Sequence, residues 1–217
     1  MWSVGCGAMD AERWMLDGLM RGLIDAPLDR GGVWLANRGA HANGVTLAGL
    51  AIGLVAAALI GAGQAGLIVV LPILASRLAD GLDGAVARAR GKTDFGGFLD
   101  IVCDFVFYGA VPLAFVLRDP AVNGVAGAFL LATFYANGAS FLGYAVLAAK
   151  RGLETRSRGE KSLYFTSGLL EGTETIAFFL VIAMWPAMFV PAAWVFGGLC
   201  IVTTVSRVIL ARRVFGR

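Results

Sequence analysis

Residues 80–104 carry four aspartates at spacings that would place them together on a helical hairpin. Asp80 and Asp83 are three residues apart, and Asp100 and Asp104 are four apart, so each pair would share one face of a helix. An antiparallel hairpin could bring these two faces together. Carboxylates so close in a poorly hydrated place repel one another unless a cation neutralises them. Because the ligand atoms are all oxygen, the pattern favours Mg²⁺, Mn²⁺ or Ca²⁺ over zinc or copper.

Small residues and one arginine accompany the aspartates along the same helical faces. The face that starts at Asp80 continues through Gly84, Ala87 and Arg88, and Gly96 stands four residues before the third aspartate. Small side chains let a ligand approach the backbone closely, and a guanidinium pairs with phosphate oxygens. Small residues in membrane helices more often serve helix packing. Beside these carboxylates, however, they indicate a nucleotide or diphosphate bound across the metal ions.

The composition identifies the chain as an all-α integral membrane protein. Of its 217 residues, 58% are hydrophobic and only 15% are charged, which excludes an ordinary soluble domain. Apolar runs of about 20 residues, the length that crosses a hydrocarbon core as a helix, predict six transmembrane helices. We expect these spans at 44–64, 66–90, 95–117, 122–149, 168–188 and 190–211. The second run turns polar after Ala79, so the part with the first aspartate pair is expected to reach the interface.

The basic residues set the expected orientation of the spans. All but two of the 18 Lys and Arg residues precede the first span, lie at the end of the last span or beyond it, or lie in or beside the connections between spans two and three and between spans four and five. By the positive-inside rule both termini and the aspartate site then face the cytoplasm. Of the two exceptions, Arg118 lies in a short turn and Arg77 is expected to neutralise the carboxylates when no metal is bound. A net charge of +3 does not indicate a nucleic-acid partner, and anionic membrane lipids are the expected contacts.

Residues 1–43 are expected to form an N-terminal interfacial segment, ahead of a six-helix membrane domain at 44–213. Apolar and aromatic residues such as Trp14 and Trp34 suggest helices that lie in the interface plane. Acidic and basic residues alternate over 10–21, and no uninterrupted apolar core typical of a cleaved signal peptide precedes the first span. No second domain is indicated.

The aspartates, glycines and arginine together match a family motif. The pattern D-x-x-D-G-x-x-A-R, followed by G-x-x-x-D-x-x-x-D, is met in full between Asp80 and Asp104. Such a motif, with many specified positions in a short segment, is far more specific than a lone glycine pattern. From about Ala42 to Arg213 the chain resembles the class I CDP-alcohol phosphotransferases. Further segments from Glu171 and from Trp194 resemble a less characterised bacterial inner-membrane branch, so a bacterial inner membrane is the expected location.

The resemblance implies a site with two divalent cations, Mg²⁺ or Mn²⁺. Asp80, Asp83 and Asp100 would hold one cation, and Asp80, Asp100 and Asp104 the other, with Asp104 as the general base. A phosphatidyl group would pass from a CDP-linked lipid, such as CDP-diacylglycerol, to the hydroxyl of an acceptor alcohol in a single displacement that releases CMP. Two cations can stabilise the attacking and leaving oxygens while one carboxylate takes the proton of the hydroxyl.

The resemblance also implies how the nucleotide would bind. Gly84, Ala87 and Gly96 would make room for the cytidine and ribose. Arg88 would steady the phosphates or the aspartate array. The family resemblance alone also implies a homodimer, because helical periodicity does not show which spans would touch.

The acceptor site is less well marked in the sequence. Glu171 and Glu174 stand near the start of the fifth span, and Arg207 lies inside the sixth. Ionisable residues in a span are costly unless they are paired or face a polar cavity, so these three are the candidates for binding the acceptor. A salt bridge of the glutamates to Arg207 or to the basic loop is an equally good interpretation. Asn137 and Ser140 share a face of the fourth span, where hydrogen bonds between helices explain them adequately.

Two other functions are compatible with intramembrane carboxylates. A divalent-cation transporter would also place them on facing helices, but near the midplane and with a polar path on both sides, whereas here they sit toward one face. A non-catalytic membrane protein that binds a CDP-lipid is the second alternative, because the four aspartates alone do not prove catalysis. The sequence does not identify the acceptor alcohol.

Overall fold

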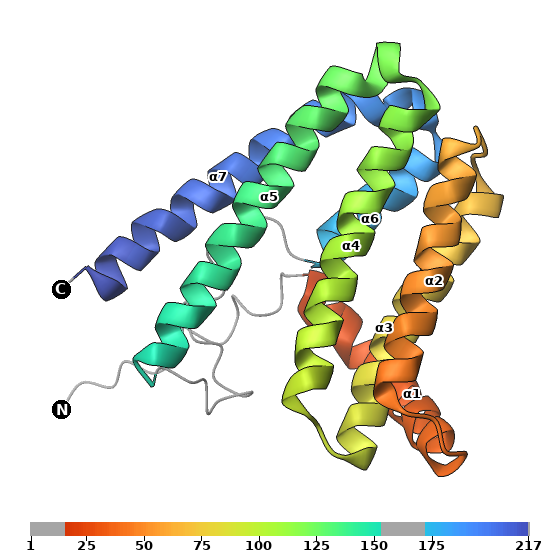
Figure 1. Cartoon of the computed structure of the whole chain (residues 1–217), viewed down its shortest axis with the longest axis vertical. Coiled ribbons are helices and arrows are strands. Elements are labelled where there is room, and N and C mark those ends of the chain that lie inside the picture. Colours follow the sequence, from red (N-terminus) through yellow and green to blue (C-terminus); the bar gives the residue numbers. More distant parts are fainter. Residues whose placement is uncertain (1–15, 153–171, 217) are drawn as a thin grey trace, which may run out of the picture. The chain divides into compact units, whose positions relative to one another are not determined.

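The computed structural model describes residues 16–152 and 172–216, with side-chain positions from residue 26 onward, and these ranges are almost entirely helical (Figure 1). Glu171 lies outside the described residues. The elements are α1 (Leu16–Asn37), α2 (Ala42–Gly61), α3 (Leu67–Arg90), α4 (Asp94–Arg118), α5 (Pro120–Lys150), α6 (Gly172–Met184), the short 3₁₀ helix η2 (Pro186–Met188) and α7 (Phe189–Phe215).

Four of the described segments are long and apolar enough to cross a membrane. They are α2, α4, α5 and the continuous stretch Pro186–Phe215. Helix α3 covers the expected second span almost completely, but its second half is polar. The described part of α6 has 13 residues, which is shorter than a full span. The all-helical membrane class is thus confirmed, and the count of six spans does not follow from the described helices alone.

The chain forms two compact units, and α2, α3 and α4 each contribute residues to both. The first unit comprises Met1–Gly53 and Leu74–Phe105, and the second comprises Leu54–Ile73 and Val106–Arg217. The first unit contains all four aspartates of the motif. The second contains Glu174 and Arg207, two of the residues that the sequence predicts for the acceptor.

The turn between α3 and α4 is defined by two local features. Gly91 has a φ of 105°, which side-chain-bearing residues rarely adopt, so α3 ends at Arg90. At the start of α4, the Thr93 hydroxyl accepts a hydrogen bond from the Gly96 N–H at 3.0 Å, which satisfies one of the free donors of the first turn. The resulting tight hairpin brings the two aspartate pairs into one unit.

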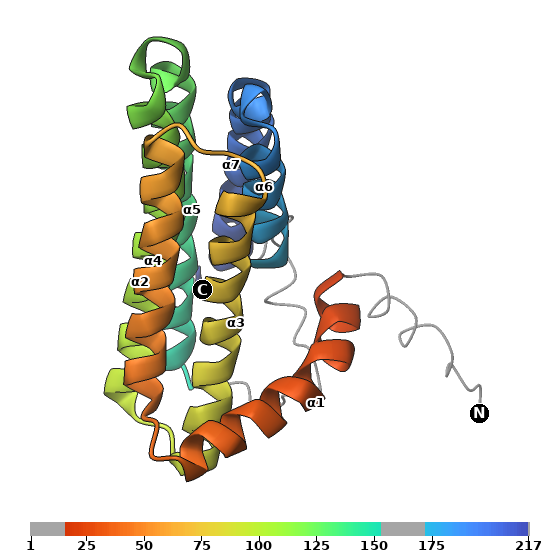
Figure 2. The same ribbon diagram turned by 90° about the vertical axis from the view of Figure 1, so that its right-hand side faces the viewer.

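Within the first unit, α1 packs against the part of α3 that carries the aspartates. Gly32 lies against the backbone of Ala85, and a Cβ atom at Gly81 would lie 2.8 Å from a methyl carbon of Leu28. Figure 2 shows α1 crossing α3 near the end of α3. Helix α1, which runs through Pro27, lies in the segment 1–43 that the sequence predicts to be interfacial.

Aromatic side chains fill the second unit. The rings of Phe115 on α4 and Phe189 are stacked with centroids 4.5 Å apart, and those of Phe178 on α6 and Phe196 on α7 are stacked at 4.3 Å. Helices α5 and α7 pack along each other. Because lipid is as apolar as these side chains, close packing rather than water exclusion holds such helices together.

Candidate active site

The hairpin of α3 and α4 brings three of the four aspartates together. One carboxylate oxygen each from Asp80, Asp83 and Asp100 lies within 4.8 Å of the others. Asp83 is buried, with 5% of its surface exposed, whereas Asp80 and Asp100 are half-buried. The two pairs predicted from helical spacing therefore face each other across the hairpin at these three positions.

The chemistry of this cluster fits a hard divalent cation. Its donors are carboxylate oxygens only, the ligand type that Mg²⁺ and Mn²⁺ prefer. The Oδ2 atom of Asp83 is buried and has no hydrogen-bond partner among the described residues. A buried, charged oxygen without a partner is costly, and a bound cation would remove that cost. The Thr46 hydroxyl, beside Asp83, donates to the Ala42 carbonyl at 3.0 Å.

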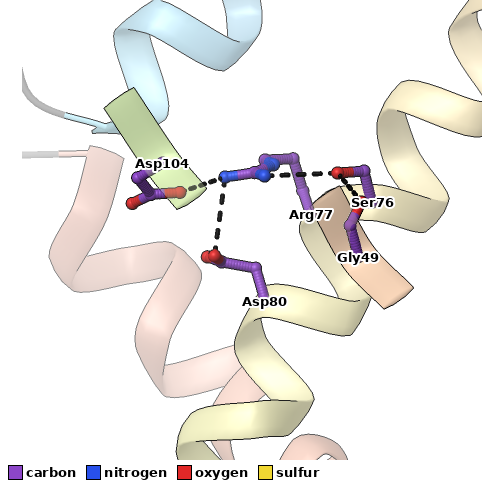
Figure 3. Close-up of polar contacts among 5 residues, drawn as sticks. All are labelled: Gly49, Ser76, Arg77, Asp80 and Asp104. Carbon is purple, nitrogen blue, oxygen red and sulfur yellow. Dashed lines mark hydrogen bonds and ion pairs between the residues drawn. The ribbon is translucent and has the colours of Figure 1, made fainter. Parts of the chain in front are cut away.

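Asp104 is not one of the three clustered aspartates, and it pairs with an arginine. Nη1 of Arg77 donates to Oδ1 of Asp104 at 2.7 Å and lies 3.6 Å from Oδ1 of Asp80 (Figure 3). Nη2 of the same guanidinium donates to Oγ of Ser76 at 3.2 Å. The Ser76 hydroxyl in turn donates to the carbonyl oxygen of Gly49 on α2 at 2.7 Å. Arg77 thus makes the contact with the carboxylates that the sequence predicts.

The small residues of the motif differ in how much space surrounds them. A Cβ atom at Gly84 would be 3.5 Å from Nη1 of Arg88, an ordinary contact. At Gly96 a Cβ atom would lie 2.9 Å from the Thr93 hydroxyl oxygen and 3.2 Å from Oδ1 of Asn43. The packing of the chain itself therefore requires a glycine at Gly96. Gly84 is different, because the room beside it is limited only by a flexible side chain.

Arg88 pairs with a residue of α1 rather than with the aspartate cluster. Its Nη2 and Nε atoms donate to Oδ1 of Asp29 at 2.6 and 3.2 Å. The two side chains are 41% and 55% exposed, so this pair contributes little to stability. Sequence reasoning missed Asp29, because no local pattern links two residues that lie 59 positions apart.

The structure describes two of the three residues predicted for the acceptor, Glu174 and Arg207. Glu174 lies half-buried in the first turn of α6. Nη1 of Arg207 donates to the carbonyl oxygen of Asn137 at 3.1 Å, to its Oδ1 at 2.9 Å and to Oγ of Ser140 at 2.7 Å. These bonds join α7 to α5. The interpretation of Asn137 and Ser140 as partners in bonding between helices therefore agrees with the structure.

Comparison with known proteins assigns the family. The family model for CDP-alcohol phosphatidyltransferases matches residues 40–209 of the chain, which include the whole aspartate motif. The chain belongs to the CDP-alcohol phosphatidyltransferase family. The resemblance predicted from the motif is thereby confirmed. This family member is a membrane-embedded transferase of phospholipid biosynthesis.

Individual relatives agree with the family assignment. The chain is 48% identical to inner membrane protein YnjF of Escherichia coli over 166 aligned residues. The aligned region covers 76% of this chain and 80% of that protein. It also resembles the crystal structure of phosphatidylinositol phosphate synthase of Mycobacterium tuberculosis with CDP-DAG bound, with a TM-score of 0.65, 25% identity, and coverage of 86% of this chain and 92% of that one. A second structure of that synthase, with manganese and citrate, matches with a TM-score of 0.59, 25% identity, and coverage of 84% and 86%.

Proposed function

We propose that this family member transfers a phosphatidyl group from a CDP-linked lipid, such as CDP-diacylglycerol, to the hydroxyl of an acceptor alcohol and releases CMP. The observation that carries the proposal is the cluster of Asp80, Asp83 and Asp100 in a chain that meets the family motif in full. The related synthase with CDP-DAG bound supports the choice of donor.

The proposed site holds two divalent cations, Mg²⁺ or Mn²⁺. Asp80, Asp83 and Asp100 would hold the first, and Asp80, Asp100 and Asp104 the second. When bound, such cations neutralise charge on the diphosphate and on the attacking and leaving oxygens. Manganese in the related synthase supports the use of a divalent metal.

Residues of the chain would bind and orient the two substrates, and one of them would accept a proton. A carboxylate oxygen of Asp104 would take the proton of the acceptor hydroxyl as that oxygen forms a bond to the lipid-side phosphorus. The bond from this phosphorus to the oxygen of CMP would break in the same displacement, so the configuration at phosphorus would invert. Gly84, Ala87 and Gly96 would leave space for the cytidine and ribose, and Arg88 would bind phosphate oxygens.

The acceptor alcohol and the membrane arrangement belong to the same proposal. Glu171, Glu174 and Arg207 are the candidates for contact with the acceptor. The proposed arrangement has six spans, with both termini and the aspartates on the cytoplasmic side of a bacterial inner membrane, which the basic residues support. The family resemblance favours a homodimer.

The decisive experiment measures the release of CMP. The purified full chain, with Mg²⁺ or Mn²⁺, would be given CDP-diacylglycerol labelled in the cytidine and a panel of alcohols. We expect CMP release with at least one alcohol. Replacing Asp104→Asn should reduce the rate by about 10²- to 10⁴-fold, the usual contribution of a general base.

The matched control is Asp94→Asn, which removes an exposed carboxylate at the start of the same helix, outside the cluster. It should leave the rate unchanged. If no alcohol supports CMP release, the proposed transfer is wrong and a binding role is favoured.

A further inference from the structure

An arginine of the chain already lies at one end of the aspartate array. The Arg77 side chain is only 14% exposed. Its Nη1 atom is 2.7 Å from Oδ1 of Asp104 and 3.6 Å from Oδ1 of Asp80 (Figure 3). These two carboxylates are the ones that the proposed second cation would share with Asp100.

The position of the guanidinium is fixed from the side away from the carboxylates. Ser76 is fully buried, and its hydroxyl is held by the Gly49 carbonyl at 2.7 Å while it accepts from Nη2 of Arg77 at 3.2 Å. Helices α2 and α3 are in close contact here, since a Cβ atom at Gly49 would lie 3.0 Å from that of Ala79. A planar guanidinium bonded at both ends has little freedom to rotate away.

We infer that Arg77 is a resident counter-charge that competes with the second divalent cation for Asp104 and Asp80. This inference rests on the proposed two-cation site. A cation at Asp104 and Asp80 would have to share these carboxylates with the guanidinium, and two positive charges within a few ångströms repel each other. The site therefore binds one cation tightly through Asp80, Asp83 and Asp100, and a second one less tightly because the guanidinium already neutralises Asp104 and Asp80.

A purely structural role for Arg77 predicts the opposite effect. If the guanidinium only held the two helices together, its loss would let the carboxylates of Asp80 and Asp104 move apart, and every cation would bind more weakly. A competing guanidinium, once removed, leaves the second cation bound more tightly. The sign of the change in affinity separates the two roles.

The test is direct binding of Mn²⁺ to the purified full chain without any CDP-lipid, with free Mn²⁺ followed by electron paramagnetic resonance. For the wild type we expect one tight and one weaker class of site. In Arg77→Gln the weaker class of site should bind Mn²⁺ at least about tenfold more tightly. The cation then no longer has to displace a charge-assisted hydrogen bond, and the free energy of one such bond corresponds to at least this change in affinity. Arg77→Lys keeps the charge without the planar fork and should fall between the two.

A control and a second variant keep the test decisive. The control is Arg118→Gln, which removes an arginine 14 residues beyond Asp104 on α4, about 21 Å along that helix. There, Nη1 of Arg118 donates to the carbonyl oxygen of Gln64. This variant should leave both Mn²⁺ affinities unchanged. If Arg77→Gln does not fold, Ser76→Ala loosens the same guanidinium and should shift the weaker class in the same direction by less. An unchanged or weakened second class in a folded variant would overturn the inference.

The outcomes for the inference and for the proposed function are separable. A wild type that releases CMP, together with Arg77 variants that bind Mn²⁺ like the wild type, overturns the inference and leaves the function standing. A wild type that releases no CMP with any alcohol, but shows the expected shift in Mn²⁺ affinity, overturns the function and leaves the competition between arginine and cation standing.

Discussion

Asp83 differs from the other aspartates of the site because its carboxylate is almost fully buried. Asp80 and Asp100 retain access to water, but Asp83 is 5% exposed and its Oδ2 has no hydrogen-bond partner among the described residues. A buried charge in that state destabilises the fold until an opposite charge reaches it. Binding of a cation should therefore stabilise the fold, and Asp83 should be the residue on which this coupling depends most.

We predict that Asp83→Asn abolishes the stabilisation of the chain by Mn²⁺. A ligand that binds only the folded state adds about 2.7 kcal/mol at a concentration one hundred times its Kd, so the wild type should show a clear rise in Tm. The variant should show none, although its Tm without metal should equal or exceed that of the wild type because a repulsive charge is gone. Thermal unfolding in detergent measures both. A full Mn²⁺-dependent rise in the variant would contradict a role for Asp83 as a ligand, and Asp94→Asn is the control that should retain the rise.

A second prediction at this scale concerns the exposed pair of Arg88 and Asp29. Asp29→Asn should change the free energy of unfolding by less than about 1 kcal/mol, as exposed ion pairs do. Arg88→Gln should raise the KM for the CDP-lipid about tenfold or more, because it removes a charge-assisted bond to a phosphate. Steady-state kinetics on both variants test whether Arg88 binds a phosphate. If the two substitutions raise the KM equally, Arg88 affects the KM only through its ion pair with Asp29 of α1.

The sequence predicted the residues of the site better than it predicted their partners. Helical spacing is enough to bring Asp80 and Asp83 opposite Asp100, and it also places Arg77 one turn before Asp80. The pairing of Asp104 with Arg77 depends on the orientation of the guanidinium by Ser76. That orientation comes from a contact with α2, which local spacing does not encode.

At the scale of elements, the turn between α3 and α4 determines whether the carboxylates meet. The sequence predicted spans at 66–90 and 95–117, and the helices run over Leu67–Arg90 and Asp94–Arg118. These ends are predictable because Gly91, which has a positive φ, and the polar residues beside it interrupt the apolar pattern. The crossing of α1 over α3 was not predictable, because it depends on close contacts at Gly32 and Gly81 with residues far along the chain.

We predict that Gly91→Ala weakens both the fold and cation binding. A residue with a Cβ atom in this left-handed conformation costs roughly 1–2 kcal/mol, and relief of that strain would change the register of Asp83 against Asp100. Thermal unfolding and Mn²⁺ titration measure the two effects. The matched control is Gly97→Ala on α4, where an added Cβ atom meets open space and a helical alanine is favoured by up to about 1 kcal/mol. Equal behaviour of the two variants would show that the turn does not set the site.

At the scale of the whole molecule, the length of α3 allows it to cross the membrane. Its 24 residues make it about 36 Å long, enough for a hydrocarbon core of about 30 Å. Only the first part, up to Ala79, is apolar, which is why α3 is not among the four described helices that hydropathy counts as spans. The expectation that α3 is a span rests on reading its polar half as an extension into the interface. If α3 crosses in the proposed orientation, the aspartates lie at the cytoplasmic end of that crossing, where the proposed water-soluble product CMP could leave.

We therefore predict that the two ends of α3 are on opposite sides of the membrane. In a variant whose native cysteines are replaced, Gln64→Cys before α3 should react with a membrane-impermeant thiol reagent in intact bacterial cells. Lys92→Cys after α3 should react only once the cells are opened, because basic residues stay on the cytoplasmic side. Both positions are exposed in the structure, so the protein itself does not block the reagent. Equal labelling of the two cysteines in intact cells would mean that α3 does not span the membrane. The aspartates would then not lie at the end of a membrane crossing, as proposed here.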